Sequence, residues 1–490
     1  MPWLTLTIVL PFLGAALTPL LPARPGRAPL LVALGATALA GVCVIATWIR
    51  FDPADGMQLV EQATWIPSLG VAWRLGVDGM SLALVALTVV LFLVAIIHGL
   101  GPAPMSRAAA GLLLLLEASC LAYFLAEDFF LFYIAFDVTL VAMYFLIALW
   151  GGERRRYAAL KFFLYTLIGS LPVLLGIIAM VLASDHGTFD MIRLADEQPI
   201  AGTGLGASLA FVAFFAGFAI KTPIVPFHTW LPAAHVEAPT SGSVLLAGVL
   251  LKLGTYGLIR VNLQMMPEAF QHFALPVALL GLVSALYGSL VALAQTDLKR
   301  LVAYTSINHM GYIVIGIAAA AATGISDRGR ELAIDGAVLQ MIAHGIVTSG
   351  LFLLAGMIAE KTGTRDLRRL GGLFRPLPVL GAVVSIMFFA SLGLPGLAQF
   401  PAELQLFLGA FDAFPVVGAL AVSGIVITAG LFLLALQRAF MGRTPERLHD
   451  LADLTRRERA TLAPLLLLTV VLGIYPRLAL DAIHSASWLL

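Results

Sequence analysis

The stretch that decides the fold is A-I-K-T-P-I-V-P-F-H-T-W-L-P, residues 219–232. It ends a long uncharged run and places Lys221 directly before Pro223 and Pro226. Proline lacks a backbone donor and clashes with the preceding turn, so we expect the helix to break just after Lys221. The carbonyls freed by a break are tolerated inside a bilayer only beside protein or water. A lysine at a break within an apolar run therefore predicts a functional site in a membrane protein.

The segment L-G-L-P-G-L-A-Q-F-P-A-E, residues 392–403, repeats this design nearer the C-terminus. We expect Pro395, Gly396 and Pro401 to interrupt a second apolar run just before Glu403. Two broken helices at matching places, each with an ionisable residue at the break, are typical of transporters built from paired repeats. Prolines also form simple packing kinks, and taken alone they support both interpretations equally.

The composition of the 490 residues agrees with a membrane location. Apolar residues make up 60% and charged residues 12%, with a mean hydropathy of +0.97. Soluble domains carry about a quarter charged residues, so a water-soluble enzyme is excluded. The 29 basic and 28 acidic residues leave no basic excess to bind nucleic acid. Cys43 and Cys120 lie in apolar runs and are expected to be core residues, not disulfide partners or metal ligands.

Apolar runs of about 20 residues predict an all-α polytopic membrane protein with about 14 transmembrane helices, the first starting at the N-terminus. The broken helices are numbers 7 and 12. They are five apart, an odd number, so helices 4–8 and 9–13 are expected to form two inverted five-helix repeats. The polar stretches at about 50–78 and 185–198 are expected to be external loops. We expect a single membrane domain over residues 1–490, with helices 1–3 in 1–106 (helix 1 at 2–23, helix 3 at 79–106), helices 4–8 in 107–262, helices 9–13 in 269–440 and helix 14 in 460–480.

Basic residues are divided unevenly between the expected loops. Nineteen, from Arg24 to Arg459, follow odd-numbered helices, and the positive-inside rule places these loops in the cytoplasm and both termini outside. Three lysines fall in or at the start of helices, namely Lys161, Lys221 and Lys252. The seven basic residues assigned to the outer side are Arg50, Arg74, Arg193, Arg260, Arg328, Arg330 and Arg477.

Ionisable residues inside the apolar runs are the candidates for chemistry, because charge at membrane depth costs about 2.5–3.5 kcal/mol. Burial lowers the pKa of a lysine, and a nearby carboxylate raises it. Moving the carboxylate therefore switches the ammonium between holding and releasing a proton. Histidine passes protons readily near neutral pH. These ionisable residues together therefore predict a proton relay. The sequence shows no motif for a nucleotide, flavin, iron–sulfur cluster or zinc. The members of the predicted relay are Glu117, Asp137, Lys221, Lys252, His309, His344 and Glu403.

Structural roles compete with the relay for several of these residues. Asp137 is as well explained as a structural partner of Lys221 as by titration, and Glu117 as a polar contact between helices. A lone membrane histidine is usually a packing residue, although the lysines and acids favour a relay role for His309 and His344. We expect His228 and His235, beyond the first break, to be loop or interface groups. These two histidines are therefore not included in the predicted relay.

Longer strings resemble a known family. The strings K-T-P-I-V-P-F-H-T-W-L-P-A-A-H-V-E-A-P-T-S-G-S-V-L-L-A-G-V-L-L-K-L-G-T-Y-G (221–257) and Q-T-D-L-K-R-L-V-A-Y-T-S-I-N-H-M-G-Y (295–312) resemble the antiporter-like membrane subunits of respiratory complex I. G-V-D-G-M-S, M-Y-F-L-I-A-L-W-G, Q-M-I-A-H-G, L-T-R-R-E and G-I-Y-P are similar to the chain M, or mitochondrial chain 4, type. The resemblance runs from about residue 75 to 480.

The resemblance implies the same fold, 14 helices with two inverted repeats, and the same functional residues. The family's lysines of helices 7 and 8 fall on Lys221 and Lys252, its histidines of helices 10 and 11 on His309 and His344, and its helix 12 glutamate on Glu403. The family usually has glutamate where this chain has Asp137. The shorter aspartate is expected to need a water or a shifted helix to contact Lys221. The family tends to G-N-F-x-G-E where this chain has A-Q-F-P-A-E, and Pro401 is expected to tighten the break.

The predicted function is that of a proton-translocating membrane-arm subunit of a proton-pumping NADH:quinone oxidoreductase, a translocase. By the resemblance, FMN, iron–sulfur clusters and quinone belong to partner subunits, which are neighbouring membrane subunits and, indirectly, a hydrophilic redox arm. The expected location is an energy-transducing membrane, the bacterial inner membrane. Two alternatives stay open: a subunit of a multi-subunit Na+/H+ antiporter, which co-assembled redox subunits would exclude, and a non-pumping scaffold subunit.

Overall fold

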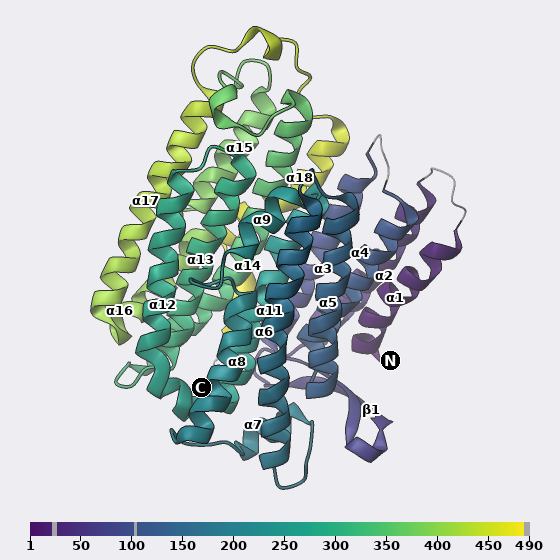
Figure 1. Ribbon diagram of the computed structural model, residues 1–490, viewed down its shortest axis with the longest axis vertical. Coiled ribbons are helices and arrows are strands. Elements are labelled where there is room, and N and C mark those ends of the chain that lie inside the picture. The colour runs from purple at the N-terminus through teal and green to yellow at the C-terminus, as the bar shows by residue number, and fades with distance from the viewer. Residues whose placement is uncertain (22–26, 102–104, 485–490) are drawn as a thin grey trace.

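The computed structural model describes residues 1–21, 27–101 and 105–484. Residues 22–23 at the expected end of helix 1, Arg24, and residues 102–104 of expected helix 3 lie outside the described residues. Long helices run side by side along the longest axis of the molecule (Figure 1). Within the described ranges, eleven are long and apolar enough to cross a membrane: α1 with η1 (Trp3–Leu17, Thr18–Leu20), α2 (Ala28–Arg50), α3 (Gly79–Gly99), α4 (Arg107–Leu125), α5 (Phe129–Trp150), α6 (Arg155–Ala183), α10 to η4 (Thr240–Leu263), α12 (Pro267–Leu293), α13 (Leu298–Ala320), α14 (Asp327–Thr362) and α17 (Pro415–Phe440).

A twelfth span is formed if α18 (Arg456–Ile474) and α19 (Arg477–Ile483), which meet at an angle of 76°, count as one. Expected helices 7 and 12 are each divided into two shorter helices, so neither passes as one uninterrupted span. The polytopic helical fold is confirmed, whereas the count of 14 and the inverted repeats stay predictions. The shorter helices are α8 (Leu205–Lys221) with α9 (Trp230–Glu237), and α15 (Pro378–Ser391) with α16 (Gln399–Ala413).

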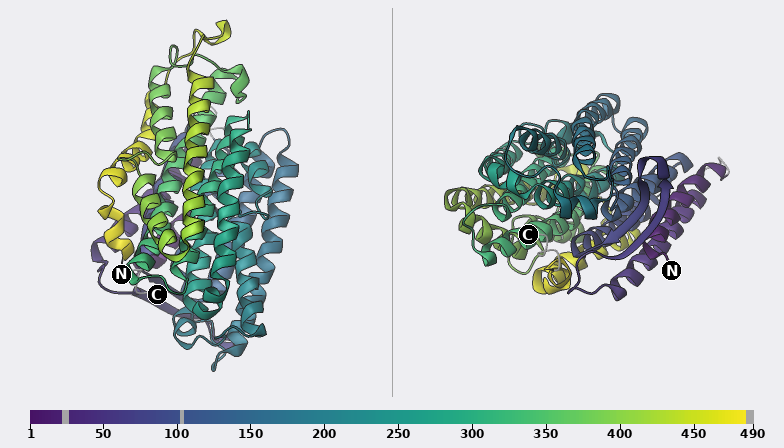
Figure 2. Two further views of the ribbon diagram at one scale, coloured as in Figure 1. Left: turned by 90° about the vertical axis from the view of Figure 1, so that its left-hand side faces the viewer. Right: turned by 90° about the horizontal axis from the view of Figure 1, so that it is seen from below.

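The centre of the molecule is built from α10–η4, α13 and α14. The apolar segments of α10–η4 and α14 are fully buried inside the protein, and the apolar segment of α13 is 94% buried. Helices that are apolar on all sides and buried in this way form the core of a bundle. In the view from below, α1 and α2 lie at one edge and α16 and α17 at the opposite edge (Figure 2). The predicted relay residues of the core helices are therefore screened from lipid.

The first helix break lies where the sequence predicts it. α8 ends at Lys221, and the non-helical residues 222–229 contain Pro223 and Pro226. Polar groups freed by the break are satisfied by protein. The Trp230 indole donates to the Ile220 carbonyl over 2.9 Å, and the Val225 amide donates to the Ser284 hydroxyl over 2.8 Å. An interrupted backbone inside a bilayer needs partners of this kind.

The second break spans residues 392–398 and contains Pro395 but not Pro401. Gly393 and Gly396 take left-handed φ values of 74° and 90°, which favour glycine. The prediction that Pro401 breaks the helix is wrong, since Pro401 lies in the first turn of α16. The first turn tolerates proline because its amides have no partner within the helix.

The polar stretch 50–78, expected to be a loop, contains a β-hairpin. Strands β1 (Gln58–Ile66) and β2 (Val71–Val77) pair antiparallel and lie across one end of the bundle (Figures 1 and 2). The hairpin is tied to the first helix because the Glu61 carboxylate accepts the backbone amides of Leu4 and Thr5 over 2.9 and 2.8 Å. Of the other expected loop, 185–198, residues Met191–Glu197 form the short helix α7.

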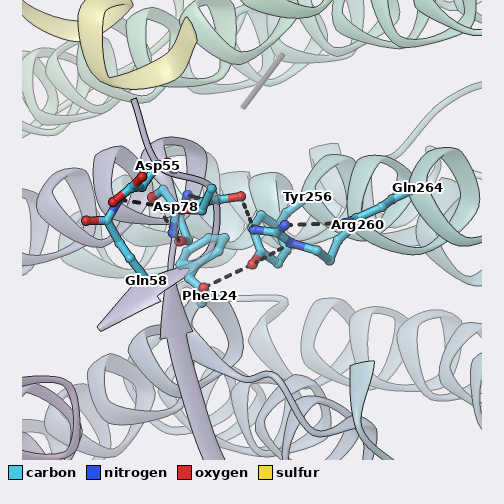
Figure 3. A network of polar contacts seen from close by, with 9 residues as sticks. Asp55, Gln58, Asp78, Phe124, Tyr256, Arg260 and Gln264 are labelled. Atoms are coloured by element: carbon cyan, nitrogen blue, oxygen red, sulfur yellow. Dashed lines mark hydrogen bonds and ion pairs between the residues drawn. The ribbon is translucent and has the colours of Figure 1, made fainter. Parts of the chain in front are cut away.

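Arg260 was assigned above to an outer loop, and the structure corrects this. Arg260 lies in η4 and is 1% exposed. Its guanidinium binds the Asp78 carboxylate over 2.6 Å and also donates to the Tyr256 hydroxyl over 3.2 Å (Figure 3). Asp78 caps α3 directly after β2, so the ion pair joins the hairpin end of the bundle to its central helix. The assignment failed because a single arginine near a helix end does not reveal whether it points to water or to a buried partner.

Candidate functional site

Six of the seven predicted relay residues, all except Glu117, come from six elements that meet inside the bundle. Asp137 lies on α5, Lys221 on α8 and Lys252 on α11 (Leu251–Gly257), which is part of the continuous helix α10–η4. All except Asp137 are buried, and Asp137 is half-buried. The other three are His309 on α13, His344 on α14 and Glu403 on α16.

Lys252 and His344 form the closest pair. The Lys252 ammonium lies 2.8 Å from His344 Nδ1 and 2.5 Å from the Ala247 carbonyl, and both residues are 0% exposed. Ala247 belongs to η3 (Leu246–Leu250), a π-helical segment, and η4 (Leu258–Leu263) is a second one beyond Lys252. Such wide turns are frequent at functional sites. The widened turn leaves the Ala247 carbonyl where the Lys252 ammonium can use it.

The next neighbour of His344 in the row is His309. The two imidazole rings have centroids 5.6 Å apart at 57°. His344 Nε2 is buried and has no hydrogen-bond partner among the described side chains and backbone. An imidazole that accepts at Nδ1 carries its proton on Nε2, so His344 can take a proton at one nitrogen and release another from the opposite side.

Gln340 joins His309 to Glu403. The Gln340 amide nitrogen lies 3.4 Å from His309 Nδ1 and donates to Glu403 Oε1 over 3.3 Å. His309 Nδ1 is itself 3.5 Å from Glu403 Oε1, and His309 Nε2 lies 3.3 Å from the Ser391 hydroxyl. The amide supports a neutral His309, and a protonated His309 can bind Glu403 directly. Lys252, His344, His309, Gln340 and Glu403 thus form one row of neighbouring polar groups.

Gly393 sets the position of the Glu403 carboxylate. A Cβ atom at residue 393 would lie 2.5 Å from Glu403 Oε2, closer than atoms approach without a shift. The left-handed φ of 74° disfavours a side chain there as well. The second break therefore brings backbone and carboxylate into a contact that only glycine permits.

The Lys221 end of the predicted relay is arranged differently. The Lys221 ammonium donates to the Thr139 hydroxyl over 3.1 Å and lies 4.6 Å from the centroid of the Phe136 ring. The described residues show no ion pair between Lys221 and Asp137. Asp137 has the hydroxyls of Tyr133 and Ser170 as polar neighbours, and its Oδ1 has no hydrogen-bond partner in the part of the chain that the structure describes. The expectation that Asp137 contacts Lys221 through a water or after a helix shift stays a prediction.

No chain of polar contacts joins Lys221 to Lys252 within the described part of the molecule. The helices that carry them pack tightly, because a Cβ atom at Gly254 would lie 2.3 Å from Thr222 Oγ1 and 2.6 Å from the Phe218 carbonyl. The row from Lys252 to Glu403 is therefore joined by polar contacts except between His344 and His309, whose rings are neighbours without a hydrogen bond in the described structure, and it is interrupted before Lys252.

Glu117 lies apart from the row. Its Oε2 accepts a hydrogen bond of 2.6 Å from the Thr37 hydroxyl on α2, and its Oε1 is buried without a partner in the described structure. The contact between α4 and α2 fits the structural alternative. A relay role for Glu117 stays an untested prediction.

Several residues of the site escaped the sequence argument. Gln340 and Thr139 are neutral, and neither stands out among the polar residues of apolar helices. His235, expected to be a loop or interface group, is 0% exposed on α9 and stacks on Phe352 with a centroid distance of 4.2 Å. Its two ring nitrogens have no partner in the described residues. His228 is also buried, at 5% exposure. Their burial could have been predicted from the sequence, because both histidines follow the break within a strongly apolar segment.

A buried carboxyl at the hairpin end differs from those of the row. Glu127 lies between α4 and α5 and is 2% exposed, with no hydrogen-bond partner for its Oε1 in the described chain. Burial raises the pKa of Glu127 to about 7, against the opposing effect of the Arg260 charge. Among the described residues, no group of three or more His, Cys, Asp or Glu side chains is placed to hold a metal ion.

Comparison with known sequences identifies relatives over almost the whole chain. The family model described as NADH:quinone oxidoreductase/Mrp antiporter, TM, matches residues 126–428. NAD(P)H-quinone oxidoreductase chain 4 1 of Synechococcus elongatus is 40% identical over 489 residues, covering 97% of this chain and 89% of the relative. NADH-quinone oxidoreductase subunit M of Rhodobacter capsulatus is 40% identical over 464 residues, covering 92% and 88%.

Solved structures give the same result. A chain of respiratory complex I from Thermus thermophilus matches with a TM-score of 0.88 and 31% identity, over 99% of both chains. A chain of the Mrp complex from Dietzia sp. matches with a TM-score of 0.83 and 27% identity, over 99% of this chain and 52% of that one.

Proposed function

The chain belongs to the NADH:quinone oxidoreductase/Mrp antiporter transmembrane family, and from this premise we propose that it is the subunit M, or chain 4, of a proton-translocating NADH:quinone oxidoreductase. The relatives' names supply the enzyme, and 40% identity over nearly the whole chain supports the assignment. The partners are then the other membrane subunits of the complex and, through them, its redox arm. FMN, iron–sulfur clusters and quinone belong to those partners.

The observation that carries a proton-translocating role is the buried row from Lys252 to Glu403. In the proposed sequence, the Lys252 ammonium gives a proton to His344 Nδ1 over 2.8 Å, and His344 releases its Nε2 proton toward His309. His309 Nδ1 then passes a proton to Glu403 Oε1, with Gln340 holding both groups. Each transfer moves one proton. His344 is then left with its proton on Nδ1, so it accepts again from Lys252 only after its ring has turned or that proton has returned to Nε2.

Lys221 and Asp137 are proposed as the inlet of this pathway. Lys221 ends α8 at a break, where the end of a helix favours a cation, and the described residues show no ion pair between Lys221 and the neighbouring Asp137. Transfer from Lys221 to Lys252 then requires water or a movement of the break, because α8 and α11 pack without a polar bridge. Coupling to a distant redox reaction needs a controlled interruption of this kind, because protons would cross an uninterrupted pathway without that reaction.

The orientation follows from charge and stays part of the proposal. With the positive-inside rule, both termini and the hairpin face the outer side of a bacterial inner membrane. We propose helices 4–8 and 9–13 as inverted repeats, each contributing one broken helix.

A subunit of a multi-subunit Na+/H+ antiporter is the second candidate, favoured by the TM-score of 0.83 to a chain of the Mrp complex. The experiment that separates the two candidates is purification of the tagged chain from its native membrane in mild detergent, with an assay of NADH:quinone reductase activity. Co-purified flavin and iron–sulfur subunits with that activity are the expected result. A pure complex of hydrophobic subunits without a redox centre would overturn the proposal in favour of the antiporter.

A further inference from the structure

An apolar groove runs along α6 beside the first helix break. It has a volume of 610 Å³, which lies within the range of small-molecule sites. One wall is the stripe Leu160, Leu164 and Ile168, whose side chains are 46–62% exposed. The other wall is formed by Ile220 and Phe227, on either side of the end of α8. In a chain that spans a bilayer, such a surface faces either an acyl chain or a neighbouring protein.

One charged side chain lines this groove. Lys161 reaches between the rings of Tyr157 and Tyr165, with its ammonium 6.0 and 5.9 Å from their centroids. Within the described residues Lys161 has no carboxylate partner. The nearby ionisable group on the break is His228, which cannot neutralise a cation. Aromatic rings stabilise an ammonium only in part, so an anionic group placed here would add to the stabilisation of Lys161.

The depth of Lys161 fits a lipid phosphate. Lys161 is six residues into α6, about 9 Å from the start of the helix, a distance that a snorkelling lysine spans to reach the headgroup layer. Arg154, Arg155 and Arg156 stand at the helix start and are exposed, with Glu153 and Glu237 as the neighbouring acids. Basic pockets between membrane helices on the cytoplasmic side, where the positive-inside rule places the start of α6, are suited to anionic headgroups.

We propose that this groove binds an anionic phospholipid of the bilayer, with the phosphate on Lys161 and an acyl chain along Leu160, Leu164 and Ile168. The bound lipid contacts the first break through Ile220 and Phe227. It also covers Tyr165, whose hydroxyl accepts a 2.7 Å hydrogen bond from Thr229 within the break. The site therefore connects the lipid composition of the membrane to the segment that follows Lys221. The binding claim stands independently of the reaction proposed above.

The test uses the intact complex that contains this chain, purified in mild detergent. Mass spectrometry counts phosphatidylglycerol retained per complex, and titration of phosphatidylglycerol or phosphatidylcholine measures thermal stabilisation. We expect Lys161→Ala to weaken phosphatidylglycerol binding about fivefold, the contribution of one lysine near an anionic surface. Leu164→Trp, which fills the groove, should weaken binding of the lipid as well, and Lys161→Arg should retain it.

The matched control is Leu182→Trp, a 79% exposed position on the same helix outside the groove, which should leave retention unchanged. A photo-reactive residue at position 164 should cross-link to lipid. Equal phosphatidylglycerol retention by Lys161→Ala and the parent, or a cross-link to another protein subunit, would overturn the proposal. Preference for phosphatidylcholine over phosphatidylglycerol would do the same.

Discussion

The two helix breaks place their charged residues on opposite sides of the interruption. Lys221 is the last residue of α8, before its break, whereas Glu403 lies in the second turn of α16, after its break. The end of a helix favours a cation and the start favours an anion. Each break thus provides the backbone polarity that its own charge requires, and the two sites are not interchangeable copies.

The surroundings of the two charges differ more than the breaks themselves. Glu403 is held by Gln340, His309 and the close approach of Gly393, whereas Lys221 donates to one neutral hydroxyl, that of Thr139, and forms no ion pair within the described residues. In the proposed pathway, Glu403 exchanges protons with fixed neighbours, and transfer from Lys221 waits for a change in geometry.

The largest expected effect comes from removing Lys252, the first member of the row. Lys252→Met leaves His344 Nδ1 and the Ala247 carbonyl without their donor, and we expect proton pumping by inverted vesicles to fall by about a hundredfold. Lys252→Arg is the control, because it keeps the charge but does not release a proton. Substantial pumping by the Arg variant would show that the charge alone matters and contradict the relay.

Glu403→Gln tests the other end of the row. The amide keeps the size of the side chain but cannot accept the proton of His309, so we expect pumping to fall about tenfold with the complex still assembled. Asp412→Asn, at an exposed position on the same helix, is the control. Pumping unchanged by Glu403→Gln would remove Glu403 from the pathway.

Gly393→Ala asks whether the second break positions the carboxylate. The added Cβ displaces Glu403 Oε2, so we expect a several-fold loss of pumping and a smaller loss of thermal stability, about 1 kcal/mol for the strained φ. Gly396→Ala is the matched control, since it shares the left-handed φ but has open space around its Cβ. Equal effects of the two substitutions would reduce the contact to backbone strain.

Asp137→Glu sharpens the contrast at the first break. The added methylene brings the carboxylate nearer to Lys221, and a direct pair at a partly buried site is expected to change pumping about two- to threefold and to shift its pH dependence. Comparison of the pH profiles of parent and variant vesicles gives the measurement. Identical profiles would mean that the residue 137 carboxylate is not coupled to Lys221.

The smallest effect concerns Glu127, a buried carboxyl without the partners that Glu403 has. Its pKa is about 7 in the folded protein against 4.5 in the unfolded chain, so the folded state holds the proton more tightly between these values. Stability from this group is therefore present at low pH and is lost as the pH rises from about 4.5 to 7. We expect Glu127→Gln to flatten the decline of the melting temperature over this range. An unchanged decline would assign it to other groups.

Much of the fold was predictable because hydropathy and proline act locally. The spans and the break after Lys221 follow from runs of residues and from the missing donors of Pro223 and Pro226. The Pro401 prediction failed because its effect depends on the helix register, which the sequence does not state. The hairpin at 58–77 was missed because the whole stretch 50–78 was judged by its charged residues, although each strand contains only one of them, Glu61 or Arg74.

The site was predictable only where a charge marks it. Lys252, His344 and Glu403 stand out in apolar segments, and the structure brings all three into one row. Gln340 carries no charge, and the π-helical turns beside Lys252 have no sequence signal that we recognise. The gap between Lys221 and Lys252 is a property of helix packing, which depends on contacts between residues far apart in the chain.

The buried pair of Asp78 and Arg260 has a consequence for how this chain changes over generations. Removing either partner leaves the other charge buried and unpaired, at a cost of about 3–5 kcal/mol, whereas replacing both with apolar residues of similar volume costs little. Lineages should therefore inherit the acid and the base together or lose them together. A survey of homologous sequences should show these two positions, 182 residues apart, changing as one, and frequent single losses would show that the hairpin end tolerates an unpaired charge.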